Sequence, residues 1–290
     1  MILNHYRVLT RPANRNRPFM CPSSPEIPRP LEPVEVALAG LPASLDGLTV
    51  LHLTDFHTRR ARRWHDRLVE AVSGLSVDLV VWTGDYIDSS GDERAAYRLM
   101  NRLIEANRPR LGAVGVYGNH DSVEMRRLFA DLPIRWLTND AWVCAGEPIT
   151  VLGVNCTHSR SNEDMVRTLR AEPRDALEQP RLRMLLAHLP AWLPTAADAG
   201  IDLVFSGHTH GGQIRLPGRR CVYNGTDGWP LHMTTGLIRR GHTMGVVSRG
   251  LGEARREGLR LFCPRQALVV TLKRDADAAF AERTVCVERW

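Results

Sequence analysis

The sequence predicts an α/β fold, and three observations support this prediction. Short apolar runs alternate with amphipathic helical patterns along most of the chain. The 290 residues, of which 43% are hydrophobic and 24% are charged, are enough to build one large buried core. Gly (23) and Pro (18) are too scarce for a fibrous or wholly disordered chain.

The N-terminal region differs in composition from the rest of the chain. Seven prolines and few large apolar residues lie between positions 12 and 33, so we expect residues 1–33 to form an extended arm. The remaining residues, 34–290, are expected to form a single domain. No apolar stretch approaches the ~20 residues of a membrane-spanning helix, and the N-terminus lacks the apolar core of a secretory signal. A cytoplasmic location is therefore expected, with peripheral contact to the inner membrane as a second expectation.

Strands and helices alternate regularly in the first half of the domain. The apolar runs LTVLHLT, DLVVWT and GAVGVY are typical of buried parallel strands, and each is followed by a helical pattern. The expected strands cover 48–54, 78–83 and 112–117, and the expected helices lie near 64–74, 93–107 and 123–131.

The second half contains shorter elements, for which antiparallel or mixed pairing is expected. Its β-like pieces cover 133–137, 141–145 and 149–154, and polar helical segments follow at about 162–179. Buried strands at 183–187 and 202–206 bracket a helix at 191–199. A final strand pair, TMGVVS (243–248) and ALVVTL (267–272), closes the domain.

Five polar clusters each follow one of the apolar strands directly. Open α/β sheets bind ligands outside the carboxyl ends of their strands, so we expect these clusters to converge. Their potential metal ligands are Asp55, His57, Asp85, Asn119, His188, His208 and His210. Carboxylate, amide and imidazole donors without a thiolate suit Mn²⁺, Fe, Zn²⁺ or Co²⁺. Seven donors exceed one tetrahedral site and would serve two ions that share a carboxylate.

The series DFH, GDYID, GNHD, AHLP and GHTHGGQ resembles the motifs of the calcineurin-like metallophosphoesterases, over roughly residues 34–275. It most resembles the bacterial membrane-associated phosphodiesterase branch that includes UDP-2,3-diacylglucosamine pyrophosphohydrolases of the chlamydial type. The resemblance implies a sandwich of two mixed β-sheets flanked by helices. It also implies two metal sites, one with Asp55, His57 and His210, the other with Asn119, His188 and His208, and Asp85 bridging both.

The resemblance further implies a reaction in which a hydroxide that bridges two divalent ions attacks a phosphodiester or pyrophosphate. Mn²⁺ is the metal expected first, with Fe, Zn²⁺ and Co²⁺ as alternatives. His120 would act as general acid or stabilise the transition state, with Asp121 as its orienting partner. The implied substrate is a phosphorylated small molecule or a lipid-linked nucleotide, which points to lipid A biosynthesis.

The positive charge of the chain leaves several partners open. The formal net charge is +6, Lys273 is the only lysine, and arginines cluster at Arg59–Arg67. Such a surface can attract nucleic acid, anionic lipid or phosphorylated substrate, and one hypothesis is that this cluster contacts an anionic membrane. Nucleic acid is not expected, because only Trp64 among these arginines could stack on a base. A nuclease of the same fold and a non-catalytic scaffold are the alternative functions.

Some polar and apolar residues outside the motifs have two interpretations. Asp88 is expected either to cap a turn or to contact substrate, whereas Phe56 and Tyr86 are expected to be packing residues. The stretch Gln213–Gly241 is interpreted as a loop. An alternative hypothesis is that Trp229 and Leu231 in this stretch help to wall a pocket for the apolar part of a substrate. Six scattered cysteines without CxxC spacing predict reduced thiols.

Overall fold

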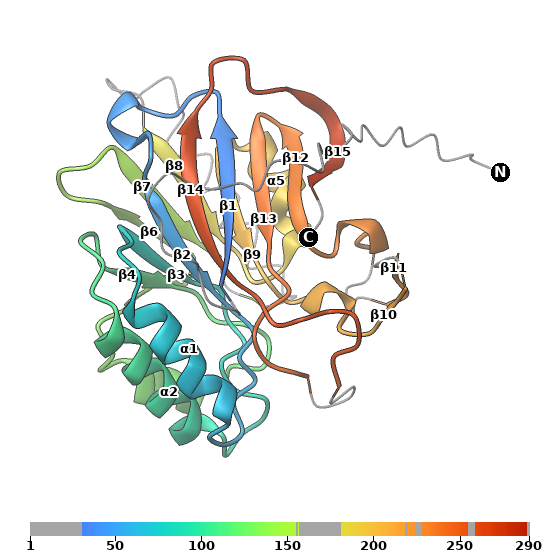
Figure 1. Ribbon diagram of the computed structural model, residues 1–290. Coiled ribbons are helices and arrows are strands. Elements are labelled where there is room, and N and C mark those ends of the chain that lie inside the picture. Colours follow the sequence, from blue (N-terminus) through green and yellow to red (C-terminus); the bar gives the residue numbers. More distant parts are fainter. Residues whose placement is uncertain are drawn as a thin grey trace.

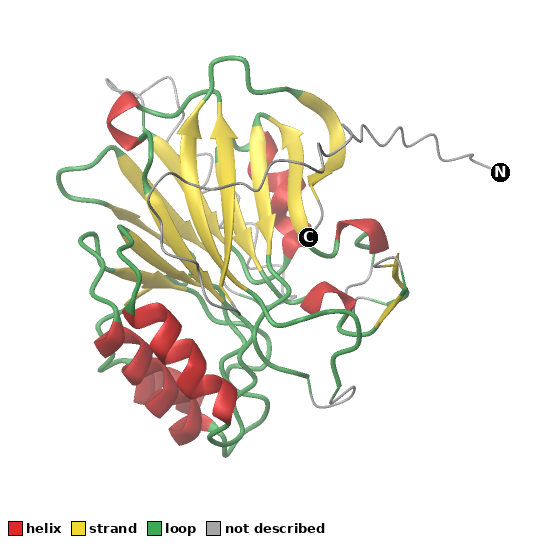
Figure 2. Ribbon diagram, in the orientation of Figure 1, coloured by secondary structure: helices red, strands yellow, loops and turns green. Residues whose placement is uncertain are grey.

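Two β-sheets packed face to face form the centre of the protein. The computed structural model describes residues 31–154, 156, 181–217, 220–223, 228–254 and 259–288. Helices cover the outer faces of the sheets (Figure 1; Figure 2). The predicted α/β class and the two mixed sheets are thereby confirmed. The polar helical segments expected at 162–179 and most of the N-terminal arm lie outside the described residues.

The first sheet has six strands, and three helices connect its parallel members. Its strand order is β1 (Leu31–Leu38), β14 (Ala267–Arg274), β2 (Thr49–Leu53), β3 (Leu79–Trp82), β4 (Ala113–Gly115) and β5 (Arg135–Trp136). Only the β14–β2 pair is antiparallel. The helices are α1 (Arg63–Ser73), α2 (Glu93–Ala106) and α3 (Val123–Phe129). They bury apolar side chains at helical spacing, such as Leu99, Met100 and Leu103 of α2, against the outer face of this sheet.

The second sheet has seven strands. Its strand order is β15 (Ala281–Glu288), β12 (Gly236–Gly241), β13 (Thr243–Val247), β9 (Leu203–Ser206), β8 (Leu182–Leu186), β7 (Ile149–Gly153) and β6 (Asp140–Val143). Strands β13, β9, β8 and β7 run parallel, and the outer pairs are antiparallel. The short helices η3 (Pro190–Trp192) and α5 (Leu193–Asp198) follow β8, and Leu193 and Ala196 pack on the outer face of the sheet.

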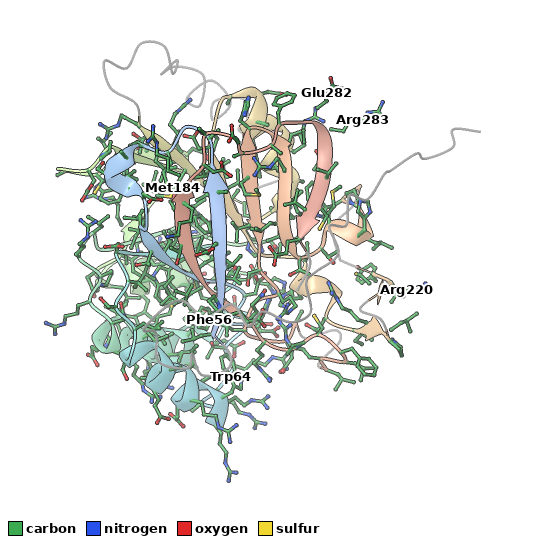
Figure 3. The ribbon with its side chains drawn as sticks, turned by 45° about the horizontal axis from the view of Figure 1, so that its top comes forward. Phe56, Trp64, Met184, Arg220, Glu282 and Arg283 are labelled. Carbon is green, nitrogen blue, oxygen red and sulfur yellow. The ribbon has the colours of Figure 1, made fainter. Side chains whose placement is uncertain are left out.

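The core between the sheets explains the continuous apolar runs in the sequence. Val50, Val81 and Val114 of the first sheet pack in one cluster with Met184 and Phe205 of the second, and Figure 3 shows Met184 in this interior. The alternate strand residues pack against the helices, so both faces of the central strands are apolar. Each fully buried aliphatic side chain contributes about 1.5–3 kcal/mol. This packing holds the carboxyl ends of both sets of parallel strands at one end of the sandwich.

Four features of the fold differ from the sequence-based expectations. The segments 243–248 and 267–272 do not pair, because β13 lies in the second sheet and β14 in the first. Strand β12 lies within the stretch expected to be a loop, and it pairs with both β13 and β15. Strands β1 and β15 were not predicted. β1 begins at Leu31, three residues before the expected start of the domain.

Short elements connect the second sheet to the candidate site. They are η4 (His210–Gly212), β10 (Arg215–Leu216), β11 (Arg220–Cys221) and η5 (Leu231–Met233), and η1 (Ala43–Leu45) lies before β2.

Trp229 does not line an open pocket, because it is only 9% exposed and packs with Met233 and Ile238. Its Nε1 donates to the Met233 carbonyl oxygen at 2.9 Å.

Several smaller expectations are also answered. Phe56 and Tyr86 are fully buried packing residues, as predicted. The described cysteines Cys144, Cys156, Cys221, Cys263 and Cys286 are all free thiols. Within the described ranges, every helix is too short or too polar to span a bilayer.

Candidate metal centre

Five of the seven candidate ligands lie on left-handed backbone turns that follow the strands. In the described part of the chain, eight non-glycine residues have positive φ angles. Five of the eight are expected metal ligands: Asp55 (φ 52°), His57 (42°), Asp85 (57°), His208 (68°) and His210 (50°). Such conformations cost of order 1–3 kcal/mol each and gather at functional sites. The concentration of strained backbone at these five residues therefore agrees with a functional role for them.

The first group of converging side chains consists of Asp55, His57, Asp85 and His210, all of them buried. One donor atom from each lies within 4.8 Å of the others. The Nε2 atoms of His57 and His210 are 2.9 Å apart. Asp85 Oδ2 lies 3.4 Å from His57 Nε2, and Asp55 Oδ1 lies 3.4 Å from His210 Nε2. The loops after β2, β3 and β9 thus meet at one point.

A second group shares Asp85 with the first and adds His188 and His208. His188 Nε2 lies 3.2 Å from Asp85 Oδ2 and 3.1 Å from His208 Nδ1. His188 Nδ1 is 2.7 Å from the Thr83 carbonyl oxygen. Because a carbonyl oxygen only accepts, Nδ1 carries the proton and the Nε2 lone pair of the neutral ring is available to a cation. Asp85 stands between the two groups, where a shared ligand is needed.

The chemistry of these groups fits two divalent cations. Burial on its own lowers the pKa of His57, but Asp85 and Asp88 raise it to about 10. Burial likewise lowers the pKa of His188, and the Asp85 charge raises it to about 9. The carboxylates thus attract positive charge into a buried cluster of imidazole nitrogens, and a cation can replace these protons. The cluster is a candidate binuclear site for divalent metal ions, and its donor set leaves the metal identity open.

The loop after β4 brings His120 to the edge of this centre. The His120 N–H donates to Asp85 Oδ1 at 3.0 Å. Its ring Nδ1 is 2.8 Å from the Asp88 carbonyl oxygen, and its ring centroid is 4.7 Å from that of His57. Asn119 lies in the same loop with its side chain exposed. Among the described residues, no hydrogen bond joins Asn119 to another candidate ligand.

The carboxylate of Asp121 binds backbone N–H groups rather than the His120 ring. Its Oδ2 accepts from Asp85 at 2.8 Å and from Gly118 at 2.7 Å. Its Oδ1 accepts from Tyr86 at 2.8 Å. The peptide N–H groups of two neighbouring turns point into this buried position and require an acceptor. The geometry therefore corrects the expectation that Asp121 orients His120, because the carboxylate ties together the loops after β3 and β4.

Two glycines allow these loops to approach one another. A Cβ atom at Gly118 would collide with Asp85 Oδ1, and a Cβ atom at Gly207 would collide with Asp55 Oδ2. Each glycine thus leaves room for the carboxylate of a candidate ligand from a different strand.

Arg260 contacts the centre directly and Arg59 reaches it through Asp88, although the motifs predict neither arginine as a site residue. Arg59 Nε lies 3.0 Å from Asp88 Oδ2, and Asp88 Oδ1 lies 3.4 Å from His57 Nδ1. Arg260 Nη2 lies 3.2 Å from His210 Nδ1. Position 59 follows the first motif by two residues, which is a weak signal. Arg260 belongs to no motif, so only the fold reveals its position.

Comparisons with known proteins agree with this site. The profile of the calcineurin-like phosphoesterase family matches residues 48–212. The chain is 27% identical to the uncharacterized metallophosphoesterase YkuE of Bacillus subtilis (strain 168), over 80% of this chain and 82% of YkuE. It is 26% identical to the uncharacterized metallophosphoesterase YkoQ of the same strain, over 74% of this chain and 79% of YkoQ. Neither name states a substrate.

Similarity to solved structures is weaker. The NAD nucleotidase of Haemophilus influenzae matches 70% of this chain and 45% of its own, at 15% identity and a TM-score of 0.46. A similarity of that size bears on neither substrate nor mechanism.

Proposed function

The chain belongs to the calcineurin-like phosphoesterase family, and from this premise we propose that it hydrolyses a phosphodiester or pyrophosphate bond with two divalent metal ions. The protein is a metal-dependent phosphoesterase. The bond, the metal and the roles of individual residues belong to the proposal. The observation that carries it is Asp85, whose carboxylate lies between two imidazole-containing groups.

Each expected ligand receives a role in this proposal. Asp55, His57 and His210 would hold one ion, whereas His188 and His208 would hold the other, and Asp85 would be the ligand that both share. Asn119 is proposed as a further ligand of the second ion on the resemblance of its motif alone. Bound divalent ions activate water and neutralise charge on the phosphoryl group. We propose Mn²⁺ as the metal to test first.

His120 is proposed as the proton donor to the leaving group. The Asp88 carbonyl oxygen accepts from Nδ1 of His120, so Nδ1 keeps its proton. The proton that passes to the oxygen leaving phosphorus is the second one, carried on Nε2 of the imidazolium form of the ring. The bond from the His120 N–H to Asp85 fixes the loop beside the centre. Asp121 holds the loops of Asp85 and His120 together through hydrogen bonds from backbone N–H groups. In the proposal it contacts no reacting atom.

An exposed apolar surface beside His210 supports a substrate with an apolar part, such as a lipid-linked nucleotide. The surface consists of six side chains that are 43–59% exposed: Leu216, Val222, Tyr223, Leu259, Leu261 and Phe262. Two backbone hydrogen bonds hold its segments together, from Leu261 to the Gln213 carbonyl at 3.1 Å and from Arg215 to the Leu261 carbonyl at 2.9 Å. Gln213 directly follows η4, which contains His210. Contiguous exposed apolar side chains are typical of binding surfaces.

Hydrolysis of bis(p-nitrophenyl) phosphate tests the proposed reaction. Metal-stripped protein should be inactive and should recover turnover on addition of Mn²⁺. His120→Ala should lower kcat by about 10²–10⁴-fold for a diester with an alkyl leaving group, because a positioned acid typically contributes that factor, and much less for bis(p-nitrophenyl) phosphate, whose nitrophenolate leaves without a proton. Turnover that persists without metal, or an equal effect of His120→Ala on both substrates, would contradict the proposal.

A lipid-linked substrate is tested separately with UDP-2,3-diacylglucosamine. The double variant Val222→Ser/Phe262→Ser should raise KM for this acylated substrate far more than KM for bis(p-nitrophenyl) phosphate. Val143→Ser is the matched control, because Val143 is 54% exposed on β6. Equal changes for both substrates in the double variant would rule out a role of the apolar surface in binding acyl chains.

A further inference from the structure

A small recess beside His57 is lined by arginines that have no role in the reaction proposed above. Its volume is about 80 Å³, and its lining includes His57, Arg59, Arg60, Arg62, Trp64 and Glu253. That volume corresponds to roughly five to eight water-sized positions. The recess is thus large enough for a group of the size of a phosphoryl group. His57 belongs to both the recess and the candidate metal centre.

The charge around the recess is positive. Three arginines line it, against a single lining acid, Glu253, and Arg59 is the only one of the three that is paired with another carboxylate among the described residues, that of Asp88. That carboxylate already forms an ion pair with Arg265, whose guanidinium also lies over the Trp64 ring at 5.2 Å. The first turn of α1 begins at Arg63, beside the recess, and its helix dipole adds partial positive charge. Guanidinium groups are suited to phosphate because their N–H donors match its oxygens in pairs.

Arg59 is held in place by an ion pair and has a further N–H donor without a partner among the described residues. Its Nε is paired with Asp88, which also faces His57. Its Nη2 is enclosed, yet it has no hydrogen-bond partner among the residues that the structure describes. The Arg59 side chain as a whole is 32% exposed, but an N–H group that is shielded from water and lacks an acceptor is costly, so an acceptor oxygen that reached Nη2 would be stabilising. The pairing with Asp88 orients the arginine before any ligand arrives.

We propose that this recess binds a second anionic group of the substrate, namely the phosphoryl group that neighbours the scissile one. The inference rests on the proposed function, because it assigns the recess to the same reaction. Arg59, Arg60 and Arg62 donate to the oxygens of the second group while the first lies at the metal centre. The enzyme consequently prefers pyrophosphates to simple diesters. A small concave recess with a fixed arginine fits a phosphoryl group better than it fits the flat surface of an anionic membrane.

A direct binding measurement tests the recess without turnover. Sulfate binding to the metal-stripped, full-length chain is measured by calorimetry at low salt, for the wild type and for Arg60→Ala/Arg62→Ala. Arg94→Ala/Arg98→Ala is the matched control, because these two arginines are exposed on α2 and the variant removes the same charge. We expect sulfate affinity to fall about tenfold in the first double variant and less than twofold in the control. Equal losses in both variants would overturn the proposal.

Competition at the metal centre tests the preference for pyrophosphates. UDP-glucose carries two linked phosphoryl groups, and its inhibition constant is measured against bis(p-nitrophenyl) phosphate with Mn²⁺ present. Arg60→Ala/Arg62→Ala should raise this constant about tenfold relative to the control variant. An unchanged constant would overturn the proposal. If neither the wild type nor any variant hydrolyses the diester, the proposed function is contradicted. The sulfate-binding measurement alone then tests whether the recess binds an anionic group.

Vesicle binding separates the recess from a membrane contact. Sedimentation with vesicles of phosphatidylglycerol and phosphatidylcholine is compared between the same two double variants. Equal sedimentation of both, together with weaker sulfate binding in Arg60→Ala/Arg62→Ala, is the expected result. Loss of vesicle binding in that variant with sulfate binding intact would assign the arginines to a membrane instead.

Discussion

The loss of the Asp121 carboxylate is expected to destabilise the protein as well as to inactivate it. Its oxygens accept three short hydrogen bonds, at 2.7–2.8 Å, from the N–H groups of Asp85, Tyr86 and Gly118. Asp121→Ala leaves three buried donors without this acceptor, at roughly 1–3 kcal/mol each. Because Asp121 is 8% exposed, water can replace part of the interaction. We therefore expect the free energy of unfolding to fall by about 3–5 kcal/mol.

Urea denaturation and thermal denaturation, both in the presence of EDTA, measure this effect without a contribution from bound metal. At about 2–4 °C per kcal/mol for a domain of this size, the midpoint of thermal unfolding should fall by roughly 6–20 °C. Asp131→Ala is the control, because Asp131 is an exposed acid near the end of α3. If Asp121→Ala lost turnover but kept the stability of the wild type within about 1 kcal/mol, the assignment of Asp121 to the backbone would be wrong.

Two further predictions concern a buried histidine and a close-packed glycine. Burial lowers the pKa of His52 to about 3, so the unfolded chain gains a proton before the folded chain does, and stability falls as the pH decreases from about 6.5. His52→Gln can keep the contact to Thr83 Oγ1 (2.8 Å) and should reduce this loss of stability by about 1.4 kcal/mol per pH unit. Urea denaturation at pH 6 and pH 4.5 measures the difference, and an unchanged pH dependence in the variant would contradict the prediction. Gly118→Ala should lower metal content and turnover because its Cβ would collide with Asp85, whereas Gly74→Ala at an open position should not; normal metal binding by Gly118→Ala would refute the close-packing argument.

The central strands and the ligand positions are the parts that the sequence predicts best. Segments such as 78–83 are buried on both faces and are therefore apolar throughout, so they can be recognised as strands from the sequence alone. The polar residues that follow them must lie at the carboxyl edge of the sheet, whatever the details of the loops. This is why Asp55, Asp85 and His188 could be placed together from the sequence.

The edge strands and the long-range pairings could not be predicted in the same way. β15 is mostly exposed or half-buried and carries no clear alternation, and β1 contains Pro33, the last proline of the Pro-rich arm. The apolar segments 243–248 and 267–272 are expected to pair with each other, but β13 pairs with the preceding β12 and with the distant β9. Strand β14 pairs with β1 and β2, both far away in the sequence. Local pattern contains no information about such partners.

Contacts between residues of different loops could also not be predicted from the sequence. Asp121 follows His120 directly, which suggests an interaction between neighbours, yet its carboxylate reaches N–H groups about 35 residues away. Arg260 approaches His210 over a separation of 50 residues. These contacts depend on how the loops fold over one another.

The number of metal ions that the chain needs for turnover tests the two-metal site most directly. Metal-stripped protein is dialysed against increasing Mn²⁺, and bound metal and hydrolysis of bis(p-nitrophenyl) phosphate are measured in the same samples, for the wild type and for Asp85→Asn. Because Asp85 lies between both groups of ligands, we expect two ions per wild-type chain at full turnover. In Asp85→Asn we expect the loss of at least one ion and of activity. Full turnover with one ion per chain, or an active Asp85→Asn variant with two ions, would contradict the two-metal site.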